Sequence, residues 1–206
     1  MNSYCSLQAN NLTGNSFYNK SNLHRAINYA DVQHAGQIRK SLDKEPFITH
    51  CLNVGNILAK THSSENAIVA GILHDTIEDT TVTKNDLIKV FGQKIAELVD
   101  FVTEHNPSDD WMERCKDYID NLKKAPQEAL CVSAADKIDN MNSMADSISR
   151  EYNIFKNMQG TPEMQLKKFT GVLEVIKGKI PKDLETMYIA SLENFIKTLS
   201  KFKYLK

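Results

Sequence analysis

The segment over residues 67–80 constrains the fold and chemistry of this chain more than any other stretch. It reads AIVAGILHDTIEDT, which is a run of apolar and small residues followed by an imidazole and three carboxylates. On a helix, His74 and Glu78 would share one face, and Asp75 and Asp79 would share the next. Burying so many ionisable groups beside an apolar segment is costly unless a metal ion or a reaction uses them. The segment therefore predicts a buried helix that ends in an active site.

Apolar residues recur with helical spacing along almost the whole chain, and no run of alternating strand residues appears. We therefore expect an all-α fold, a compact single-domain bundle of about eight to ten helices. The predicted elements are helices over 23–37, 47–60 and 110–123, a charged loop over 40–46, a helix from Ser63 or Ser64 to His74 or beyond, and a long helix that begins near Pro126 and carries Asp136 and Asn140.

Caps and breakers mark the remaining helix boundaries. Thr83, with Asp86 three positions later, is expected to cap a helix, and Gly92 to separate two short helices. Residues 160–162 start another helix, which residues 178–181 separate from the last one. The last helix carries an apolar stripe made of Leu184, Tyr188, Leu192, Phe195, Leu199 and Phe202. We favour a core position for this stripe over a dimer face, because an amphipathic helix most often closes its own core. The oligomeric state stays open.

Length and charge narrow the class of protein. A chain of 206 residues can form one sizeable core, so we expect one domain over 21–206 after a polar, loosely ordered segment over 1–20. The net charge of -1 gives no reason to expect nucleic acid or a membrane as a partner. No segment reads as a signal peptide or a membrane span, and the four cysteines show no Cys-x-x-Cys spacing. A cytoplasmic location fits these features best.

Two further segments offer partners for the pair formed by His74 and Asp75. His50 stands at the start of a predicted helix, and Asp136 follows two alanines that would let helices approach closely. Two imidazoles and two carboxylates form a mixed nitrogen and oxygen set, which suits a divalent transition metal such as Mn²⁺. An all-oxygen set would favour Mg²⁺ or Ca²⁺, and a thiolate set a structural zinc. The residues therefore predict a site for one divalent transition-metal ion such as Mn²⁺.

The four residues, in this order, resemble the metal-binding signature of the HD superfamily of phosphohydrolases. Flanking blocks are similar to the hydrolase domain of the Rel/Spo-type alarmone enzymes: HAGQIRK at 34–40, EPFITH at 45–50, HDTIEDT at 74–80, WMER at 111–114 and ADKIDNM at 135–141. A bare His-Asp pair is a weak signal, whereas His-Asp-x-x-Glu-Asp with these blocks is strong. Because the chain has no room for a synthetase domain, it most resembles the stand-alone small alarmone hydrolases.

The resemblance implies an activity and a set of roles. The 3′-pyrophosphate of guanosine 3′,5′-bis(diphosphate), or of the pentaphosphate form, would be removed with Mn²⁺ in the site, giving pyrophosphate and GDP or GTP. The implied roles are metal ligand for His50, His74, Asp75 and Asp136, catalytic carboxylate for Glu78 and Asp79, and nucleotide contact for Arg39, Lys40, Asn140 and Ser143. A carboxylate one turn from a ligand is placed to orient or deprotonate water. The two basic residues would supply positive charge that the nearly neutral chain otherwise lacks.

Three departures from the family pattern bear on the substrate. Cys51 stands where the family usually has proline, Ser133 and Ala134 replace a usual Lys-Leu, and Asp139 occupies a position often held by His or Tyr. None of them removes a metal ligand, so they bear on nucleotide preference more than on hydrolysis. The alternatives are a different nucleotide substrate, such as NADPH, and a catalytically inactive module that binds an alarmone. Retention of both catalytic carboxylates argues against the inactive module.

Overall fold

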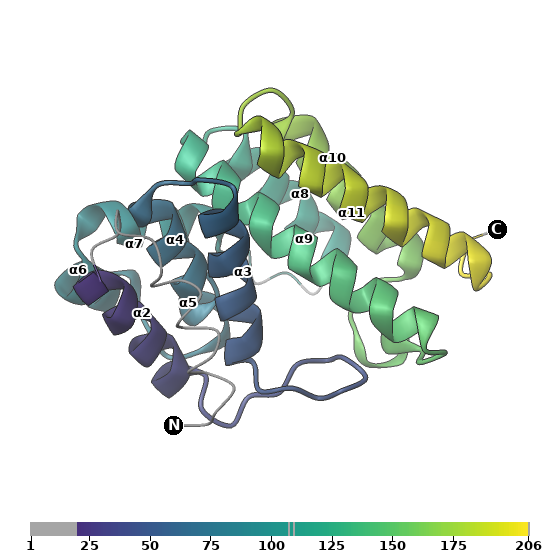
Figure 1. Cartoon of the computed structure of the whole chain (residues 1–206), viewed down its shortest axis with the longest axis horizontal. Helices are drawn as coiled ribbons and strands as arrows, with labels where there is room; N and C mark the ends of the chain where they lie inside the picture. The colour runs from purple at the N-terminus through teal and green to yellow at the C-terminus, as the bar shows by residue number, and fades with distance from the viewer. Residues whose placement is uncertain (1–19, 107, 109, 206) are drawn as a thin grey trace.

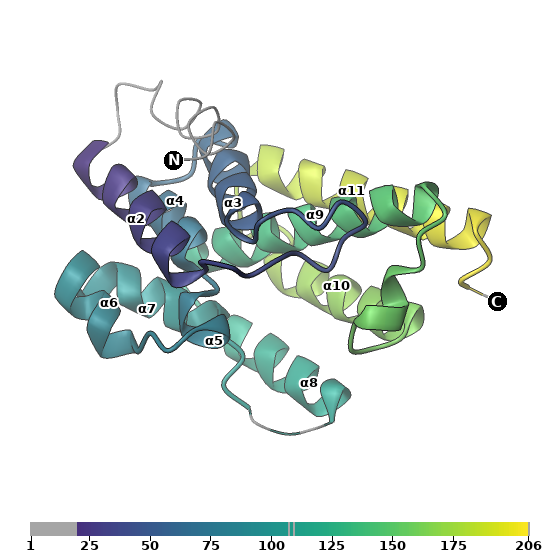
Figure 2. The same ribbon diagram turned by 90° about the horizontal axis from the view of Figure 1, so that it is seen from below.

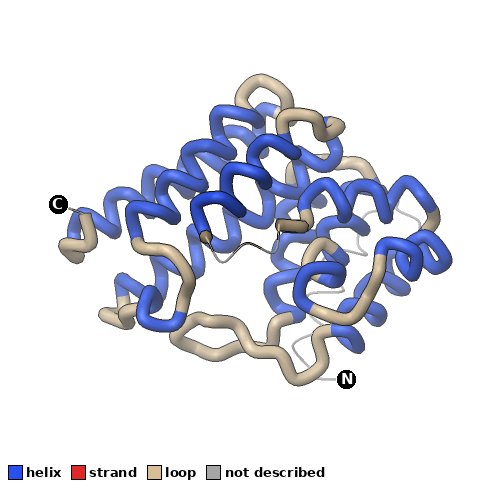
Figure 3. The backbone as a smooth tube through the Cα atoms, turned by 180° about the vertical axis from the view of Figure 1, so that it is seen from behind, coloured by secondary structure: helices blue, strands red, loops and turns tan. Residues whose placement is uncertain are grey.

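A computed structural model describes residues 20–205 except 107 and 109, so the segment expected over 1–20 lies almost wholly outside the described residues. Over the described part, the chain is built from helices, and its one β pairing is an isolated bridge between Ile38 and Pro46 (Figures 1 and 3). The all-α prediction is confirmed. The elements are α2 (Lys20–Gln33), α3 (Ile48–Lys60), α4 (Glu65–Leu73), α5 (Thr76–Asp79), α6 (Lys84–Phe91), α7 (Gln93–Val102), α8 (Trp111–Leu122), α9 (Gln127–Ser149), the 3₁₀ turn η1 (Ile154–Asn157), α10 (Pro162–Ile176) and α11 (Lys182–Lys201).

Local capping chemistry sets the start of several helices. The side chain of Ser64 accepts a hydrogen bond from the backbone N–H of Ala67 at the start of α4. Thr83 and Asp86 form a reciprocal capping box at the start of α6, as predicted. Gly92 has φ of 86° and separates α6 from α7, a conformation that favours glycine. These boundaries were predictable because each depends on residues within one turn of the helix end.

Two helices end earlier than the sequence predicts. Helix α2 stops at Gln33 instead of near Gln37, because Gly36 adopts φ of 81° and turns the chain into the following loop. The helix expected to run through His74 stops at Leu73, and α5 resumes only at Thr76. At this break the Thr76 hydroxyl donates to the Leu73 carbonyl at 2.6 Å, a local bond that competes with the helical pattern. The helix predicted to reach His74 or beyond therefore ends one residue earlier, and residues 74–75 separate it from α5.

Helix α9 is the centre of the bundle and contacts α11, α3, α4, α7 and α10. Its small side chains allow this close approach, and nearly all of its residues from Ala129 to Met141 are buried. Figure 1 shows α11 lying along α9. The apolar stripe of α11 is buried there from Leu184 to Leu199, and Phe202 packs partly buried against the core. The prediction that this stripe closes the protein's own core is confirmed.

The loop over residues 34–47 passes under the bundle from α2 to α3 and reaches the far end of α9 (Figures 1 and 2). Its tip is held there, because Asp43 forms a two-pronged ion pair with Arg150, with N–O distances of 2.5 and 2.7 Å. The backbone N–H of Leu42 also donates to the Ser147 hydroxyl at 3.3 Å. The loop therefore lies across the face of the molecule where the predicted ligands gather. None of the described helices is both long and apolar enough to span a membrane.

Candidate functional site

The four predicted metal ligands come together from three parts of the fold. His50 lies in the first turn of α3, His74 and Asp75 form the break between α4 and α5, and Asp136 lies in the middle of α9. The two Nε2 atoms are 3.2 Å apart, and Asp136 Oδ1 is 3.3 Å from the Nε2 of His50. Asp75 Oδ2 is 3.0 Å from the Nε2 of His74. The two histidines and Asp136 are buried, and Asp75 is half-buried at the rim.

Each histidine is oriented by a hydrogen bond at its other ring nitrogen. The Nδ1 of His50 donates to the carboxylate of Asp139 at 2.7 Å, and the Nδ1 of His74 donates to the carbonyl of Gly71 at 2.8 Å. Because both acceptors are oxygens, the Nδ1 atoms carry protons and both Nε2 lone pairs can face a metal. Ligands about 2.1 Å from one ion lie about 3 Å apart in neighbouring positions. The observed spacing and donor set therefore fit a divalent cation.

The electrostatics of this cluster also favour a cation. Burial by itself lowers the pKa of His50, but hydrogen bonds with Asp136, Asp139 and Asp75 raise it to about 9. Burial likewise opposes protonation of His74, yet the neighbouring carboxylates hold its pKa well above the usual value. The cluster thus binds protons more tightly than ordinary histidines do. A divalent cation would supply the same positive charge in place of those protons.

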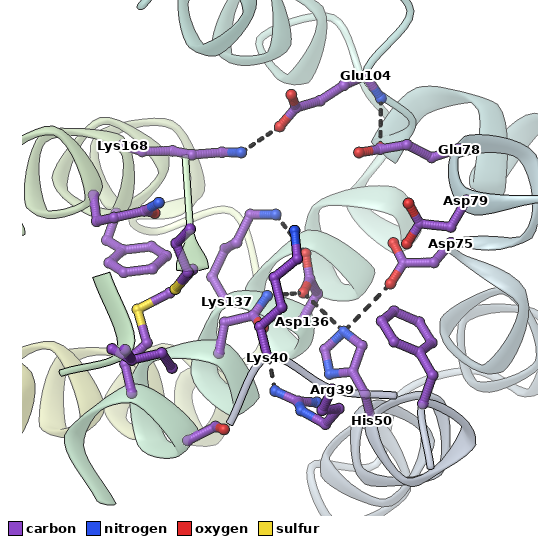
Figure 4. A pocket seen from close by; sticks show the side chains of 18 of the residues that line it. Arg39, Lys40, His50, Asp75, Glu78, Asp79, Glu104, Asp136, Lys137 and Lys168 are labelled. Carbon is purple, nitrogen blue, oxygen red and sulfur yellow. Dashed lines mark hydrogen bonds and ion pairs between the residues drawn. The ribbon is translucent and has the colours of Figure 1, made fainter. Parts of the chain in front are cut away.

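A cavity of about 510 Å³ opens beside the cluster, between α5, α8, α9, α10 and the 34–47 loop (Figure 4). All four predicted nucleotide contacts and both predicted catalytic carboxylates line it: Arg39, Lys40, Asn140, Ser143, Glu78 and Asp79. His50, Asp75 and Asp136 also line this cavity, whereas His74 lies behind them. The structure therefore brings the three predicted groups of residues to one place.

Glu78 and Asp79 face the cavity from α5. The Oε2 of Glu78 accepts the backbone N–H of Glu104 at 2.9 Å, which holds the side chain against the segment that follows α7. Although both side chains are exposed to the cavity, desolvation by its walls and the charge of Asp75 raise the pKa of Glu78 to about 7 and that of Asp79 to about 6. A carboxylate with a pKa near neutrality can exchange a proton with water during a reaction.

The two predicted basic residues are held differently. Arg39 donates to Asp139 at 2.6 Å and to the side-chain carbonyl of Asn140 at 3.4 Å, and only 9% of its side chain is exposed. Lys40 is exposed and extends toward the middle of the cavity (Figure 4). Lys40 therefore has the freer charge for an anionic ligand, whereas part of the Arg39 charge is balanced within the protein.

Sequence reasoning missed several residues of the cavity. Lys168, on α10, pairs with Glu104 and lies over the rings of Trp111 and Tyr118, 5.7 and 5.1 Å from their centroids. Lys137 forms an ion pair with the carboxylate of Asp136, a predicted ligand, at 2.5 Å. The sequence could have indicated that Lys137 lies at the site, because it directly follows the predicted ligand Asp136. No sequence signal pointed to Lys168 or Glu104, because they lie in separate segments without a motif.

The departures noted in the sequence also have defined places. Cys51 is fully buried, and burial raises the pKa of its thiol. Ser133 is also fully buried, and its hydroxyl shares a 2.7 Å hydrogen bond with the hydroxyl of Tyr118. Asp139, by contrast, contacts residues of the site directly.

Comparison with known proteins agrees with this geometry. The family model of the HD domain matches residues 26–159. A probable GTP pyrophosphokinase of Mycobacterium leprae is 36% identical over 167 residues, which are 78% of this chain but 19% of that protein. MESH1 of Drosophila melanogaster, a guanosine-3′,5′-bis(diphosphate) 3′-pyrophosphohydrolase, is 32% identical over 129 residues, which are 62% of this chain and 72% of that protein.

The fold also has a solved counterpart. A metazoan orthologue of SpoT, described as hydrolysing ppGpp, matches with a TM-score of 0.71 and 25% sequence identity. The match covers 92% of this chain and 100% of the other. The helical fold, the ligand cluster and the matched residues lead to one assignment. This chain belongs to the HD domain family.

Proposed function

We propose that this protein is an Mn²⁺-dependent hydrolase that removes the 3′-pyrophosphate from guanosine 3′,5′-bis(diphosphate) or the pentaphosphate form. The observation that carries the proposal is the convergence of His50, His74 and Asp136 within 4.8 Å of one another at a cavity that Glu78 and Asp79 also line. The likeness to the Drosophila pyrophosphohydrolase supports the choice of substrate. The mixed nitrogen and oxygen donor set supports Mn²⁺.

The proposed ligands hold the ion, and the rest of the site serves the substrate. A bound divalent cation would lower the pKa of a water molecule and offset negative charge on the phosphate oxygens. Glu78 faces the cavity one turn beyond His74, and its backbone hydrogen bond with Glu104 keeps the carboxylate in place. We assign Glu78 to orient the attacking water and accept its proton, with Asp79 as a second carboxylate in support.

The bond changes follow from the products. The water oxygen bonds to the phosphorus attached to O3′, the bond between that phosphorus and O3′ breaks, and the proton held by Glu78 can be returned to the departing O3′. Lys40 extends into the cavity and would bind phosphate oxygens as a point charge. Asn140 and Ser143 line the same wall and can donate hydrogen bonds to the nucleotide.

The test is a panel of nucleotides incubated with the protein loaded with Mn²⁺, with released pyrophosphate and phosphate measured separately. The panel contains guanosine tetraphosphate and pentaphosphate, NADPH, GTP and ATP. Pyrophosphate release from the first two supports the proposal. Phosphate release from NADPH alone would assign a different substrate, and binding of the tetraphosphate without turnover would indicate an inactive binding module. The Asp136→Ala variant is the control for contaminating phosphatases.

A further inference from the structure

Asp139 stands between the proposed metal site and the loop that carries Arg39. Its carboxylate accepts three hydrogen bonds: from His50 Nδ1 at 2.7 Å, from an Arg39 guanidinium nitrogen at 2.6 Å, and from the side-chain amide of Asn53 at 3.0 Å. Only 12% of its side chain is exposed. This enclosed carboxylate stays ionised because all three neighbours donate hydrogen bonds to it. The bonds from His50 and Arg39 end on the same oxygen, Oδ2.

The two histidines of the site are supported in different ways. His74 donates its Nδ1 proton to the carbonyl of Gly71, which every residue type would offer at that position. His50 donates to the side chain of Asp139, so this bond depends on which residue occupies position 139. A carboxylate acceptor fixes the orientation of the ring and makes the opposite nitrogen a stronger metal ligand. The support of His50, unlike that of His74, can therefore be removed by changing one side chain, Asp139.

The same region connects Arg39 to two proposed ligands. One guanidinium nitrogen of Arg39 shares Asp139 Oδ2 with His50, and the other lies 3.4 Å from the Asn140 side-chain carbonyl. The amide nitrogen of Asn140 in turn donates to Asp136 Oδ1 at 2.5 Å. A single side chain, Asp139, thus bridges Arg39 and His50 by hydrogen bonds, and a single side chain, Asn140, bridges Arg39 and Asp136. A displacement of Arg39 would therefore shift the side chains that hold His50 and Asp136, and a displacement of either ligand would likewise shift Arg39.

We propose that Asp139 is a positioning residue that couples the metal site to Arg39 through one shared carboxylate. It holds the His50 ring with Nε2 toward the ion, and it holds the Arg39 guanidinium at the wall of the cavity. Asp139 is not one of the proposed ligands, and it does not line the cavity. The inference rests on the proposed function only in taking His50 as a metal ligand, and its test requires no nucleotide.

The test measures Mn²⁺ affinity by isothermal titration calorimetry on the full chain after chelator treatment. Asp139→Asn keeps the shape of the side chain but removes its charge, and we expect it to weaken Mn²⁺ binding by about 10- to 100-fold. The matched control is Asp146→Asn, the same change on the same helix at an exposed carboxylate that pairs with Arg150. The control should bind Mn²⁺ like the wild type. If Asp139→Asn lowers thermal stability but binds Mn²⁺ with wild-type affinity, Asp139 is structural and the proposal is overturned.

A second comparison tests the coupling to Arg39. Once Asp139 is neutralised, the charge of Arg39 is no longer balanced near the ion. Adding Arg39→Gln to Asp139→Asn should therefore recover part of the lost affinity. Strictly additive effects of the two changes would refute the coupling.

If Asp139→Asn does not fold, Asn53→Ala keeps the test decisive. It removes one of the three bonds to the carboxylate and leaves the carboxylate itself in place. A smaller loss of Mn²⁺ affinity in the same direction supports the proposal, and wild-type affinity contradicts it. Failure of the nucleotide panel would overturn the proposed substrate and leave these titrations unaffected. Absence of Mn²⁺ binding in the wild type would overturn the metal assignment itself.

Discussion

Gly71 links the packing of two helices to the geometry of the proposed metal site. It lies on α4, where an added Cβ would be 2.4 Å from Leu58 Cδ1 and 3.2 Å from Val54 Cγ1, both on α3. Leu58 is fully buried, so its methyl group has no free space to enter. Helices α3 and α4 also carry or adjoin His50 and His74, whose Nε2 atoms are 3.2 Å apart. Gly71→Ala should therefore disturb both packing and metal binding.

The magnitude follows from the contact distance. Carbon atoms pack at about 3.5–4.0 Å, so the variant requires the buried Leu58 side chain, or α3 and α4 themselves, to shift by about 1 Å. Overpacking of this kind costs about 1–3 kcal/mol, and the higher helix propensity of alanine offsets about 1 kcal/mol of it. We expect a net loss of up to about 2 kcal/mol in the unfolding free energy of the metal-free protein. A ligand set displaced by more than about 0.5 Å should also bind Mn²⁺ at least about tenfold more weakly.

Urea unfolding of the metal-free protein and calorimetric titration with Mn²⁺ measure the two effects separately. Gly171→Ala is the matched control, because Gly171 lies on α10, away from the proposed ligands. Its added Cβ would be 2.6 Å from the terminal methyl group of Ile119 on α8. Ile119 is only half-buried and lines an open groove, so it can turn aside. The control should gain stability and keep its Mn²⁺ affinity. The reasoning is refuted if Gly71→Ala is as stable as this control and binds Mn²⁺ like the wild type.

Three further variants test the proposed roles. Asp136→Ala should lose Mn²⁺ binding and activity together, and full metal occupancy by elemental analysis would contradict its role as a ligand. Glu78→Gln should retain Mn²⁺ but lose about 10²- to 10⁴-fold in kcat, because it cannot accept a proton; turnover near the wild-type rate would place the base elsewhere. The double change Arg39→Ala and Lys40→Ala should raise KM at low salt, with a smaller effect at high salt because charge attraction is screened over about 10 Å at 0.1 M. Unchanged kinetics in that variant would show that neither residue binds the substrate.

Local features of the sequence determined much of this protein. Helical periodicity, the caps at Ser64 and Thr83, and the breaker Gly92 act within one or two turns, so the chain near each of them was sufficient to place a boundary. The apolar stripe of the last helix favoured core packing over a dimer face, because an amphipathic helix most often closes its own core. The spacing of the His-Asp-x-x-Glu-Asp segment also indicated that its residues gather where a buried apolar helix ends, although the structure divides them between a break and the short helix α5.

Contacts between distant segments were decided only by the tertiary structure. The amide of Glu104 that holds Glu78 and the place of Lys168 in the cavity arise from segments that meet only when the chain folds. The Arg39 side chain reads as a free cation in the sequence, yet it shares a carboxylate with His50 through Asp139, one hundred residues away. Nothing within a turn of either residue could indicate this pairing, because ion pairs in a helical bundle depend on how the helices pack and not on the order of the chain.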